Sequence, residues 1–280
     1  MTDEYGLFGF PVHHSWSPFI HGMFARQSGQ DMVYRLHETP PDQFRSDVLA
    51  FFSGGGCGIN VTLPHKRAAA DLVNELTPRA QLADAVNTVV RRDELLVGDN
   101  TDGAGLLADL TRNLGLGWKS PRILVLGAGG AARGALESLL SLQPRQIVVA
   151  NRTVARATQL AKEFAELGPV TGCEFGKLEN QRFDLIVNAT SASLRGEVPL
   201  IPIGVVDSMT VCYDMAYGVG DTAFVAWARR LGAARAEQGW GMLVEQAAEA
   251  FELWRGIRPD TKPVLEALRH RAATAAGTRP

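Results

Sequence analysis

The sequence predicts an α/β fold made of two α/β domains. Short apolar segments with the pattern of strands alternate with segments of helical periodicity along almost the whole chain, which is the order of elements in layered α/β proteins. A strand that ends in a glycine-rich turn begins only past residue 120. The unit that contains this turn starts past residue 100, and the roughly 100 residues before it have a strand and helix pattern of their own, so we expect a separate N-terminal domain.

The elements of the N-terminal part follow from apolar periodicity and from turn residues. The expected strands are residues 5–10, 32–37, 58–62, 87–92 and 94–99, and the expected helices are 42–52, 65–75, 103–114 and one that starts at Ser17. Ser17 followed by Pro18 fits an N-cap with proline at the first helical position. The last two strands are close enough in sequence to form a hairpin.

The second part has the rhythm of a parallel sheet, with a strand before residue 127 and further strands at 146–150, 169–173, 184–188 and 210–214. A helix is expected over 154–167. From residue 239 to 255 apolar residues recur at helical spacing and predict a long helix with a broad apolar face. A last helix follows Pro263.

The glycine turn carries the most specific local signal. Gly127, Gly129 and Ala132 fit the G-x-G-x-x-G/A fingerprint of a dinucleotide-binding βαβ unit. The first glycine permits a tight turn, the second lets a pyrophosphate approach the backbone, and the small third residue lets the helix pack near the strand. The helix start then offers free N–H groups to the phosphates.

The next strand indicates which dinucleotide is bound. It ends in Asn151-Arg152-Thr153, with Arg156 one turn into the following helix. An NAD-binding unit places a carboxylate near this point to hold the ribose 2′-hydroxyl, whereas a guanidinium binds a 2′-phosphate. The pattern therefore favours NADP. The alternative is that both arginines are solvated charges at a helix start.

Composition excludes several classes of protein. The 280 residues are 46% hydrophobic and carry a net charge of −2, which favours neither nucleic acid nor an anionic membrane. No signal peptide or membrane-spanning run is recognisable. Three distant cysteines suggest no disulfide framework, so we expect a cytoplasmic protein. The spacing of His13, His14 and His21 resembles no metal-ligand set, and no metal is expected.

Four polar clusters stand at expected strand ends or helix starts in the N-terminal domain. They are the runs from His14 to Pro18, from Asn60 to Lys66, from Ala85 to Val90 and from Gly98 to Gly103. Taken singly, each has a structural explanation: helix capping for the first and last, a surface lysine for the second, and a backbone partner of an asparagine for the third.

Together these clusters resemble the shikimate dehydrogenase family. The ordered motifs are His-Ser-x-Ser-Pro, Asn-Val-Thr-x-Pro-x-Lys, Ala-Val-Asn-Thr, Gly-Asp-Asn-Thr-Asp-Gly, Gly-Ala-Gly-Gly-Ala, Asn-Arg-Thr, Asn-Ala-Thr, Tyr-Asp-Met and Gly-Met-Leu-Val-x-Gln-Ala. They run from about Tyr5 to Val264. The resemblance implies a substrate domain of residues 1–102 plus 239–280 and a Rossmann-type NADP-binding domain of residues 103–238.

The resemblance also implies the site residues. Lys66 matches the catalytic lysine of the family and Asp102 its partner carboxylate. The matching substrate residues are Ser15, Ser17 and Tyr217 for the carboxylate, and Asn60, Thr62, Asn87 and Gln246 around the ring. The matching cofactor residues are Gly127, Ala128, Gly129, Gly130, Ala131, Asn151, Arg152, Thr153, Arg156, Met215 and Gly239.

The residue types suit the implied reaction, the reversible NADP-dependent reduction of 3-dehydroshikimate to shikimate in aromatic amino acid biosynthesis. A lysine ammonium both stabilises a forming alkoxide and donates a proton, so no metal is needed. Bulky Phe10, Trp16 and Trp240 depart from the family pattern. An alternative is therefore a paralogue that has low shikimate activity or acts on quinate or a related cyclitol acid. A non-catalytic NADP-binding regulator is the alternative of another class. We expect a monomer or homodimer whose partner is the small-molecule substrate.

Overall fold

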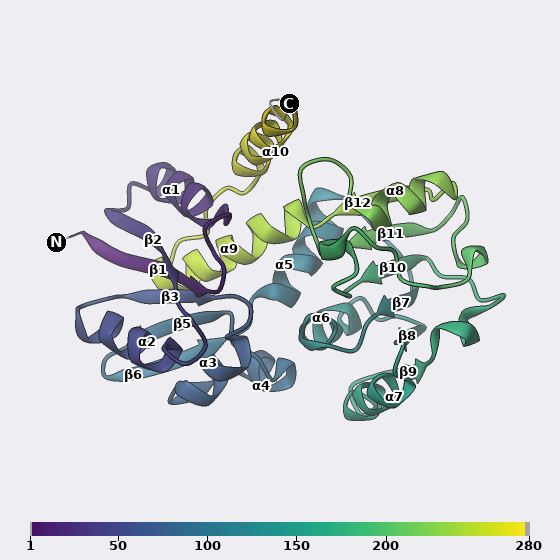
Figure 1. The fold of residues 1–280 in the computed structure, drawn as a ribbon, viewed down its shortest axis with the longest axis horizontal. Helices are drawn as coiled ribbons and strands as arrows, with labels where there is room; N and C mark the ends of the chain where they lie inside the picture. The colour runs from purple at the N-terminus through teal and green to yellow at the C-terminus, as the bar shows by residue number, and fades with distance from the viewer. Residues whose placement is uncertain (1, 278–280) are drawn as a thin grey trace. The chain divides into compact units, whose positions relative to one another are not determined.

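The computed structural model describes residues 2–277, which form two compact units (Figure 1). The first unit comprises the chain up to Gly105 together with Leu243–Leu268, and the second comprises Leu106–Met242 and the chain from Arg269 on. The assignment of residues 1–102 plus 239–280 to substrate binding and of residues 103–238 to NADP binding stays a prediction.

The first unit is built on a mixed sheet of six strands in the order β2-β1-β3-β5-β6-β4. Its elements are β1 (Asp3–Gly9), α1 (Ser17–Ser28), β2 (Met32–Glu38), α2 (Phe44–Ser53), β3 (Gly58–Val61), α3 (Lys66–Leu72), β4 (Glu75–Leu76), α4 (Pro78–Ala83), β5 (Thr88–Arg92) and β6 (Leu95–Asp99). The strands β5 and β6 pair antiparallel, which confirms the predicted hairpin. Phe8, Val48 and Ile59 lie in the core of this unit.

The start of α1 and the end of α3 differ from the sequence-based expectation. The helix α1 does begin at Ser17, but Trp16 is its N-cap and makes no side-chain cap. The Ser15 hydroxyl instead accepts a hydrogen bond from the Ser17 N–H, at 3.2 Å. The helix expected to reach residue 75 ends at Leu72, because the next residues leave it to form β4, whose Glu75 is paired with Val97 of β6.

The second unit contains six parallel strands in the order β12-β11-β10-β7-β8-β9. Its elements are β7 (Arg122–Leu126), α6 (Gly130–Leu140), β8 (Gln146–Ala150), α7 (Val154–Glu163), β9 (Val170–Cys173), β10 (Leu185–Asn188), β11 (Val211–Asp214), α8 (Ala223–Arg230) and β12 (Arg235–Gln238). Read from β9, this is the 3-2-1-4-5-6 order of the dinucleotide-binding fold, with the reversal between β7 and β10.

Three helices carry the chain between the units: α5 (Asp102–Ala108), α9 (Trp240–Arg255) and α10 (Lys262–Gly277). The helix expected to continue to residue 114 changes at Asp109–Asn113 into a π-helical turn. There the carboxylate of Asp109, which is 1% exposed, accepts a 2.6 Å hydrogen bond from the Tyr213 hydroxyl. A buried carboxylate needs such a donor, and here it is found at the wider π-helical turn.

Candidate active site

Strand register in the first unit aligns polar residues in one row across the sheet. Asn60 of β3 is opposite Thr88 of β5, and Thr88 is opposite Asp99 of β6. The strand β5 runs antiparallel to both neighbours, so its start lies at the same edge as their carboxyl ends. Polar residues from three separate sequence clusters thereby reach one edge of the sheet.

Lys66 and Asp102 meet at this edge. The Lys66 Nζ donates to Asp102 Oδ2 at 2.5 Å, and their side chains are 25% and 16% exposed. Lys66 is the first residue of α3 and Asp102 the first of α5, so both are placed by the starts of short helices. Such a partly enclosed pair holds an ammonium in a fixed position while leaving part of it accessible to a ligand.

Asn87 connects this pair to the rest of the edge. Its Nδ2 donates to Asp102 Oδ1 at 2.8 Å and to Thr101 Oγ1 at 3.0 Å. Its Oδ1 accepts from the Thr101 N–H at 2.8 Å and from the Thr88 hydroxyl at 2.9 Å. Gln246 Oε1 lies 3.4 Å from Asn87 Nδ2. Thr88 and Thr101 were not predicted as site residues, although both lie within the Ala-Val-Asn-Thr and Gly-Asp-Asn-Thr-Asp-Gly motifs.

Ser15 and Ser17 contact each other in the same unit, and Asn60 is joined to Asn87 through Thr88. The Ser15 hydroxyl donates to Ser17 Oγ at 3.1 Å. Asn60 Nδ2 donates to Thr88 Oγ1 at 3.1 Å, and Asn60 Oδ1 accepts from the Tyr34 hydroxyl at 2.8 Å. A lone tyrosine in an expected strand gave no signal in the sequence, so Tyr34 was missed.

Aromatic side chains pack against the ring of Tyr34. The His21 ring is stacked on Tyr34 with centroids 4.3 Å apart and interplanar angle 8°, and Phe24 and Trp254 also contact it. Burial lowers the pKa of His21 to about 3, an effect that the Asn60 amide opposes. His21 is therefore a neutral packing residue at physiological pH.

Thr62, Trp16 and Phe10 flank these clusters. Thr62 follows β3 and is half-buried, and its side chain fills the space that a Cβ on Gly9 would need. The ring of Trp16 meets Phe19 edge to face at 6.4 Å. Phe10 is 45% exposed, so it adds apolar surface beside the polar edge without entering the core.

The turn that carries Asp102 is fixed by a buried ion pair. The Arg79 guanidinium binds both carboxylate oxygens of Asp99, from Nε at 2.7 Å and from Nη2 at 2.6 Å. Burial favours a raised pKa for Asp99, but hydrogen bonds from Arg79 and Thr77 hold the pKa below its ordinary value. The Asn100 side chain then accepts a hydrogen bond from the Asp102 N–H at 3.1 Å. This bond fixes the backbone of Asp102 relative to the turn.

In the second unit the glycine turn has the open backbone that the predicted phosphate site requires. Gly127 has φ +103°, and a Cβ there would lie 3.1 Å from the Ala189 carbonyl oxygen, so only glycine suits this position. A Cβ on Gly129 or on Gly130 would have no atom within 4 Å. Ala128 is half-buried, whereas Gly129, Gly130 and Ala131 at the start of α6 are exposed. Ala132, in the first turn of α6, is fully buried. These features fit a bound pyrophosphate.

The end of β8 fits the second part of a dinucleotide. Asn151 Nδ2 donates to the Thr153 carbonyl oxygen at 3.0 Å, which shapes the turn before α7. Arg152, Thr153 and Arg156 are exposed there. The two guanidinium groups are thus exposed to an anionic ligand, although the charge of Arg152 also lowers the pKa of the Glu197 carboxylate.

The predicted residues after β11 share one loop in the second unit. Asp214 ends the strand and is fully buried. Burial raises its pKa, and hydrogen bonds from Ser193 and Thr222 oppose the effect. Met215 and Tyr217 follow, both half-buried. Burial raises the pKa of Tyr217 to about 12, so its phenol stays protonated and able to donate. A Cβ on Gly239 would lie 2.6 Å from the Met215 carbonyl oxygen.

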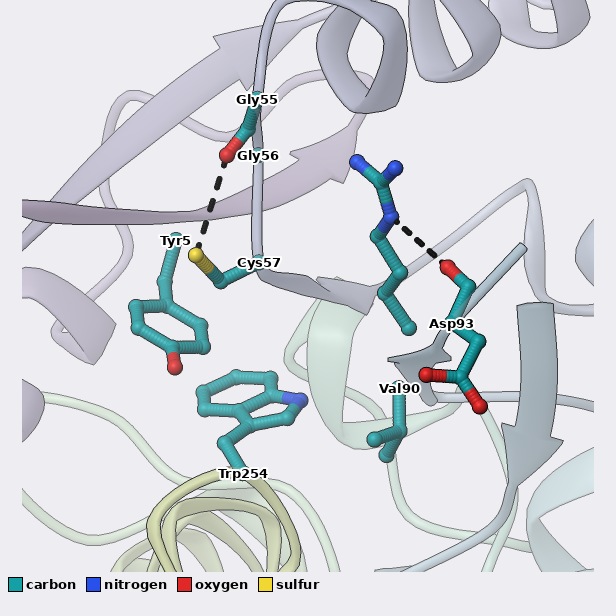
Figure 2. A pocket seen from close by; sticks show the side chains of 8 residues that line it. Tyr5, Gly55, Gly56, Cys57, Val90, Asp93 and Trp254 are labelled. Atoms are coloured by element: carbon teal, nitrogen blue, oxygen red, sulfur yellow. Dashed lines mark hydrogen bonds between the residues drawn. The ribbon is translucent and has the colours of Figure 1, made fainter. Parts of the chain in front are cut away.

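A surface hollow of about 410 Å³ (Figure 2) shares Trp254 with the aromatic cluster around His21. Its lining includes Tyr5, Cys57, Arg91 and Trp254. Burial raises the pKa of Cys57, which disfavours the reactive thiolate. Arg91 is already bonded to the carbonyl oxygens of Asp93 and Phe52. The hollow shares no residue with the predicted site.

Two structural findings bear on the class of protein. Among residues 2–277, no helix is both long and apolar enough to cross a bilayer. Over the same part of the chain, histidine, cysteine and acidic residues form no group of three suited to a metal ion.

Comparisons with known proteins agree with the motifs. Residues 7–89 match the substrate-binding domain of shikimate dehydrogenase, residues 109–196 match shikimate/quinate 5-dehydrogenase, and residues 239–269 match the C-terminal domain of shikimate 5′-dehydrogenase. The NADP(+)-dependent shikimate dehydrogenase of Methylococcus capsulatus is 53% identical over 98% of both chains.

Solved structures show the same two-unit chain. An Ael1 enzyme from Pseudomonas putida superposes with a TM-score of 0.91 at 45% identity, covering 95% of this chain and 98% of that one. Shikimate 5-dehydrogenase from Thermus thermophilus, in complex with NADP(H) and shikimate, superposes with a TM-score of 0.85 at 33% identity, covering 96% and 99%. The fold and the polar edge define an oxidoreductase of the dinucleotide-binding class. The chain belongs to the shikimate dehydrogenase family.

Proposed function

We propose that this protein is an NADP-dependent shikimate dehydrogenase that reversibly reduces 3-dehydroshikimate to shikimate, with Lys66 and Asp102 as its catalytic residues. The observation that carries the assignment is the 2.5 Å contact between Lys66 Nζ and Asp102 Oδ2 at a polar edge of the first unit. Relatives at 53% identity are NADP(+)-dependent shikimate dehydrogenases, which supports the substrate and the cofactor.

Lys66 moves the proton in this proposal. NADPH, when bound, supplies the hydride that reduces the ketone. Lys66 Nζ donates a proton to the forming alkoxide and accepts it in the reverse direction. Asp102 holds the ammonium at the hydroxyl, and Asn87 occupies the other carboxylate oxygen. The positive charge on Lys66 also stabilises the developing negative charge on the substrate oxygen.

The other predicted residues bind and orient. Ser15, Ser17 and Tyr217 donate hydroxyl hydrogen bonds to the substrate carboxylate. Asn60, Thr62, Asn87 and Gln246 bind around the ring and its hydroxyls. The glycine turn, Asn151, Arg152, Thr153 and Arg156 hold NADP, with Met215 and Gly239 near the nicotinamide. We assign residues 1–102 plus 239–280 to the substrate domain and 103–238 to the NADP domain, and we propose a cytoplasmic monomer or homodimer.

A direct assay tests the function. Purified protein is given shikimate or quinate with NADP+ or NAD+, and nicotinamide reduction is followed by absorbance. We expect rapid turnover only with shikimate and NADP+. Tight NADP+ binding without turnover of either acid would contradict the enzyme assignment and support a regulator. Turnover of quinate in preference to shikimate would point to a paralogue whose pocket has been reshaped near Phe10, Trp16 and Trp240.

Replacing Arg152 by alanine tests the choice of cofactor. The variant loses a guanidinium for the 2′-phosphate, so kcat/KM for NADP+ falls about 10- to 100-fold. The value for NAD+ changes less than threefold, because NAD has no phosphate at this place. Steady-state kinetics with both cofactors measure the ratio. Arg145→Ala removes another exposed arginine of the same unit and leaves the ratio unchanged. An equal loss with both cofactors would contradict a 2′-phosphate contact.

A further inference from the structure

The loop between β11 and α8 contains little that fixes its own shape. It carries Met215 and Tyr217 and continues through Gly218 and Gly220. Glycine loses more conformational freedom on ordering than any other residue. A loop of this composition holds a tyrosine in one place only if groups from other elements bind its backbone.

Gln238 supplies such groups from the last residue of β12. It is paired in register with Asp214, the residue before the loop. The Gly218 N–H donates to Gln238 Oε1 at 3.0 Å, and Gln238 Nε2 donates to the Gly220 carbonyl oxygen at 3.0 Å. One amide therefore accepts from one side of the loop and donates to the other, which neither a carboxylate nor an ammonium does.

Trp240 contacts the tyrosine itself. Its ring lies 4.6 Å from the Tyr217 ring, tilted by 42°, and the residue is 5% exposed. Tilted aromatic contacts of this separation are attractive and directional. Gly239, between Gln238 and Trp240, donates its N–H to the Ala216 carbonyl oxygen at 3.0 Å. Three consecutive residues thus contact the loop from Ala216 to Gly220.

Asp214 anchors both ends of the same loop. Its Oδ1 accepts from the Ala216 N–H at 3.2 Å, and its Oδ2 accepts from the Thr222 hydroxyl at 2.6 Å. With both ends held by Asp214, the part still to be fixed is the centre, residues 217–220. The centre is where the Gln238 amide binds.

We propose that Gln238 is a positioning residue, which with Trp240 holds the Tyr217 hydroxyl at the place where it binds the substrate carboxylate. This inference rests on the proposed function of Tyr217. Gln238 itself touches neither substrate nor cofactor in this account. It acts by keeping the glycine-flanked loop in one conformation, so that binding does not have to order it.

Gln238→Ala tests the inference. We expect the KM for shikimate to rise about tenfold, because ordering the loop then opposes substrate binding. We expect kcat and the KM for NADP+ to change less than threefold, since the lost interaction contributes equally to ground and transition states. A shikimate KM within twofold of wild type in a folded variant would overturn the inference. Circular dichroism checks folding.

Gln238→Glu gives a readout that a purely structural role would not move. The ionised carboxylate still accepts from the Gly218 N–H but faces the Gly220 carbonyl oxygen with no proton to donate. The protonated acid restores the donor. The ratio of its shikimate KM to that of wild type should therefore approach one below about pH 4.5 and match Gln238→Ala above pH 7. If the ratio of the two shikimate KM values does not depend on pH, the proposed role of the Gln238 amide is wrong.

Two further variants separate this inference from the function on which it rests. Tyr217→Phe removes the hydroxyl and keeps the ring contact with Trp240. If it leaves the shikimate KM unchanged, the assignment of Tyr217 fails, and the inference fails with it. If it raises the KM while Gln238→Ala does not, only the inference fails. Gln181→Ala is the matched control, because it removes another glutamine that bonds to a backbone carbonyl, that of Lys177, and it changes no kinetic constant.

Discussion

Replacing Lys66 by alanine is expected to lower kcat about 10³- to 10⁵-fold. The variant loses both the proton donor and the positive charge beside the developing alkoxide, and each contributes about two or more orders of magnitude. The Kd for NADP+, measured by calorimetry, should stay within twofold, because the glycine turn and Arg152 belong to the other unit. Stopped-flow measurement of nicotinamide reduction gives the rate.

Two more substitutions sharpen this result. Lys66→Arg keeps a positive charge, but a guanidinium does not release its proton near neutral pH, so most of the loss in kcat should remain. Arg67→Ala is the matched control: it changes the next residue of α3, whose side chain is 61% exposed and pairs with Asp71 and Asp84 at the surface. A rate for Lys66→Ala within tenfold of wild type would rule out Lys66 as the proton donor.

Replacing Arg79 by methionine is expected to lower the free energy of unfolding by about 3 kcal/mol or more. The side chain of Asp99 is 4% exposed and binds Arg79 through two hydrogen bonds. Methionine keeps much of the apolar volume but leaves a buried carboxylate without its cation, which is costly. Glu249 also loses the Arg79 contact but keeps Arg258. Urea unfolding followed by circular dichroism measures the change.

The sign of the pH dependence provides a second check. The pKa of Asp99 is lowered in the folded protein, so its contribution to stability is present above the unfolded pKa near 4 and is lost as pH falls through the folded pKa. The difference between wild type and Arg79→Met should therefore be full at pH 7 and shrink below about pH 4. Arg182→Met removes a cation from an exposed pair with Asp207 and should cost less than about 1 kcal/mol. Equal stabilities of wild type and Arg79→Met at pH 7 would contradict the account.

The local sequence pattern was enough to predict several elements. The strand over residues 146–150 is β8 with the same bounds, and the apolar stripe from residue 239 to 255 predicts α9 within one residue. The elements β4, α4, α8 and β12 were missed. β4 has two residues, too few to show a period. β4 and β12 pair with the neighbouring strands β6 and β11, which offer backbone partners.

For the candidate site, too, the sequence predicts some features and only the structure shows the others. The resemblance of the ordered motifs to the family predicts Lys66, Asp102 and Asn87 as site residues, because residue types and their order can be compared without any geometry. The motifs did not reveal that Asn87 bonds to Asp102, or that Tyr34 holds Asn60. Those contacts join residues 15 and 26 positions apart, and only strand register brings them together.

The sequence by itself thus determined the family, the α/β class and the identity of the polar residues, since periodicity and short motifs are local properties. Tertiary structure decided which polar groups are paired, which are buried, and what holds the loops that carry them. The Asp99–Arg79 ion pair and the Gln238 contacts with the loop after β11 are both of this kind. Hydrogen bonds act over about 3 Å, so their partners are set by how strands and helices pack rather than by neighbours along the chain.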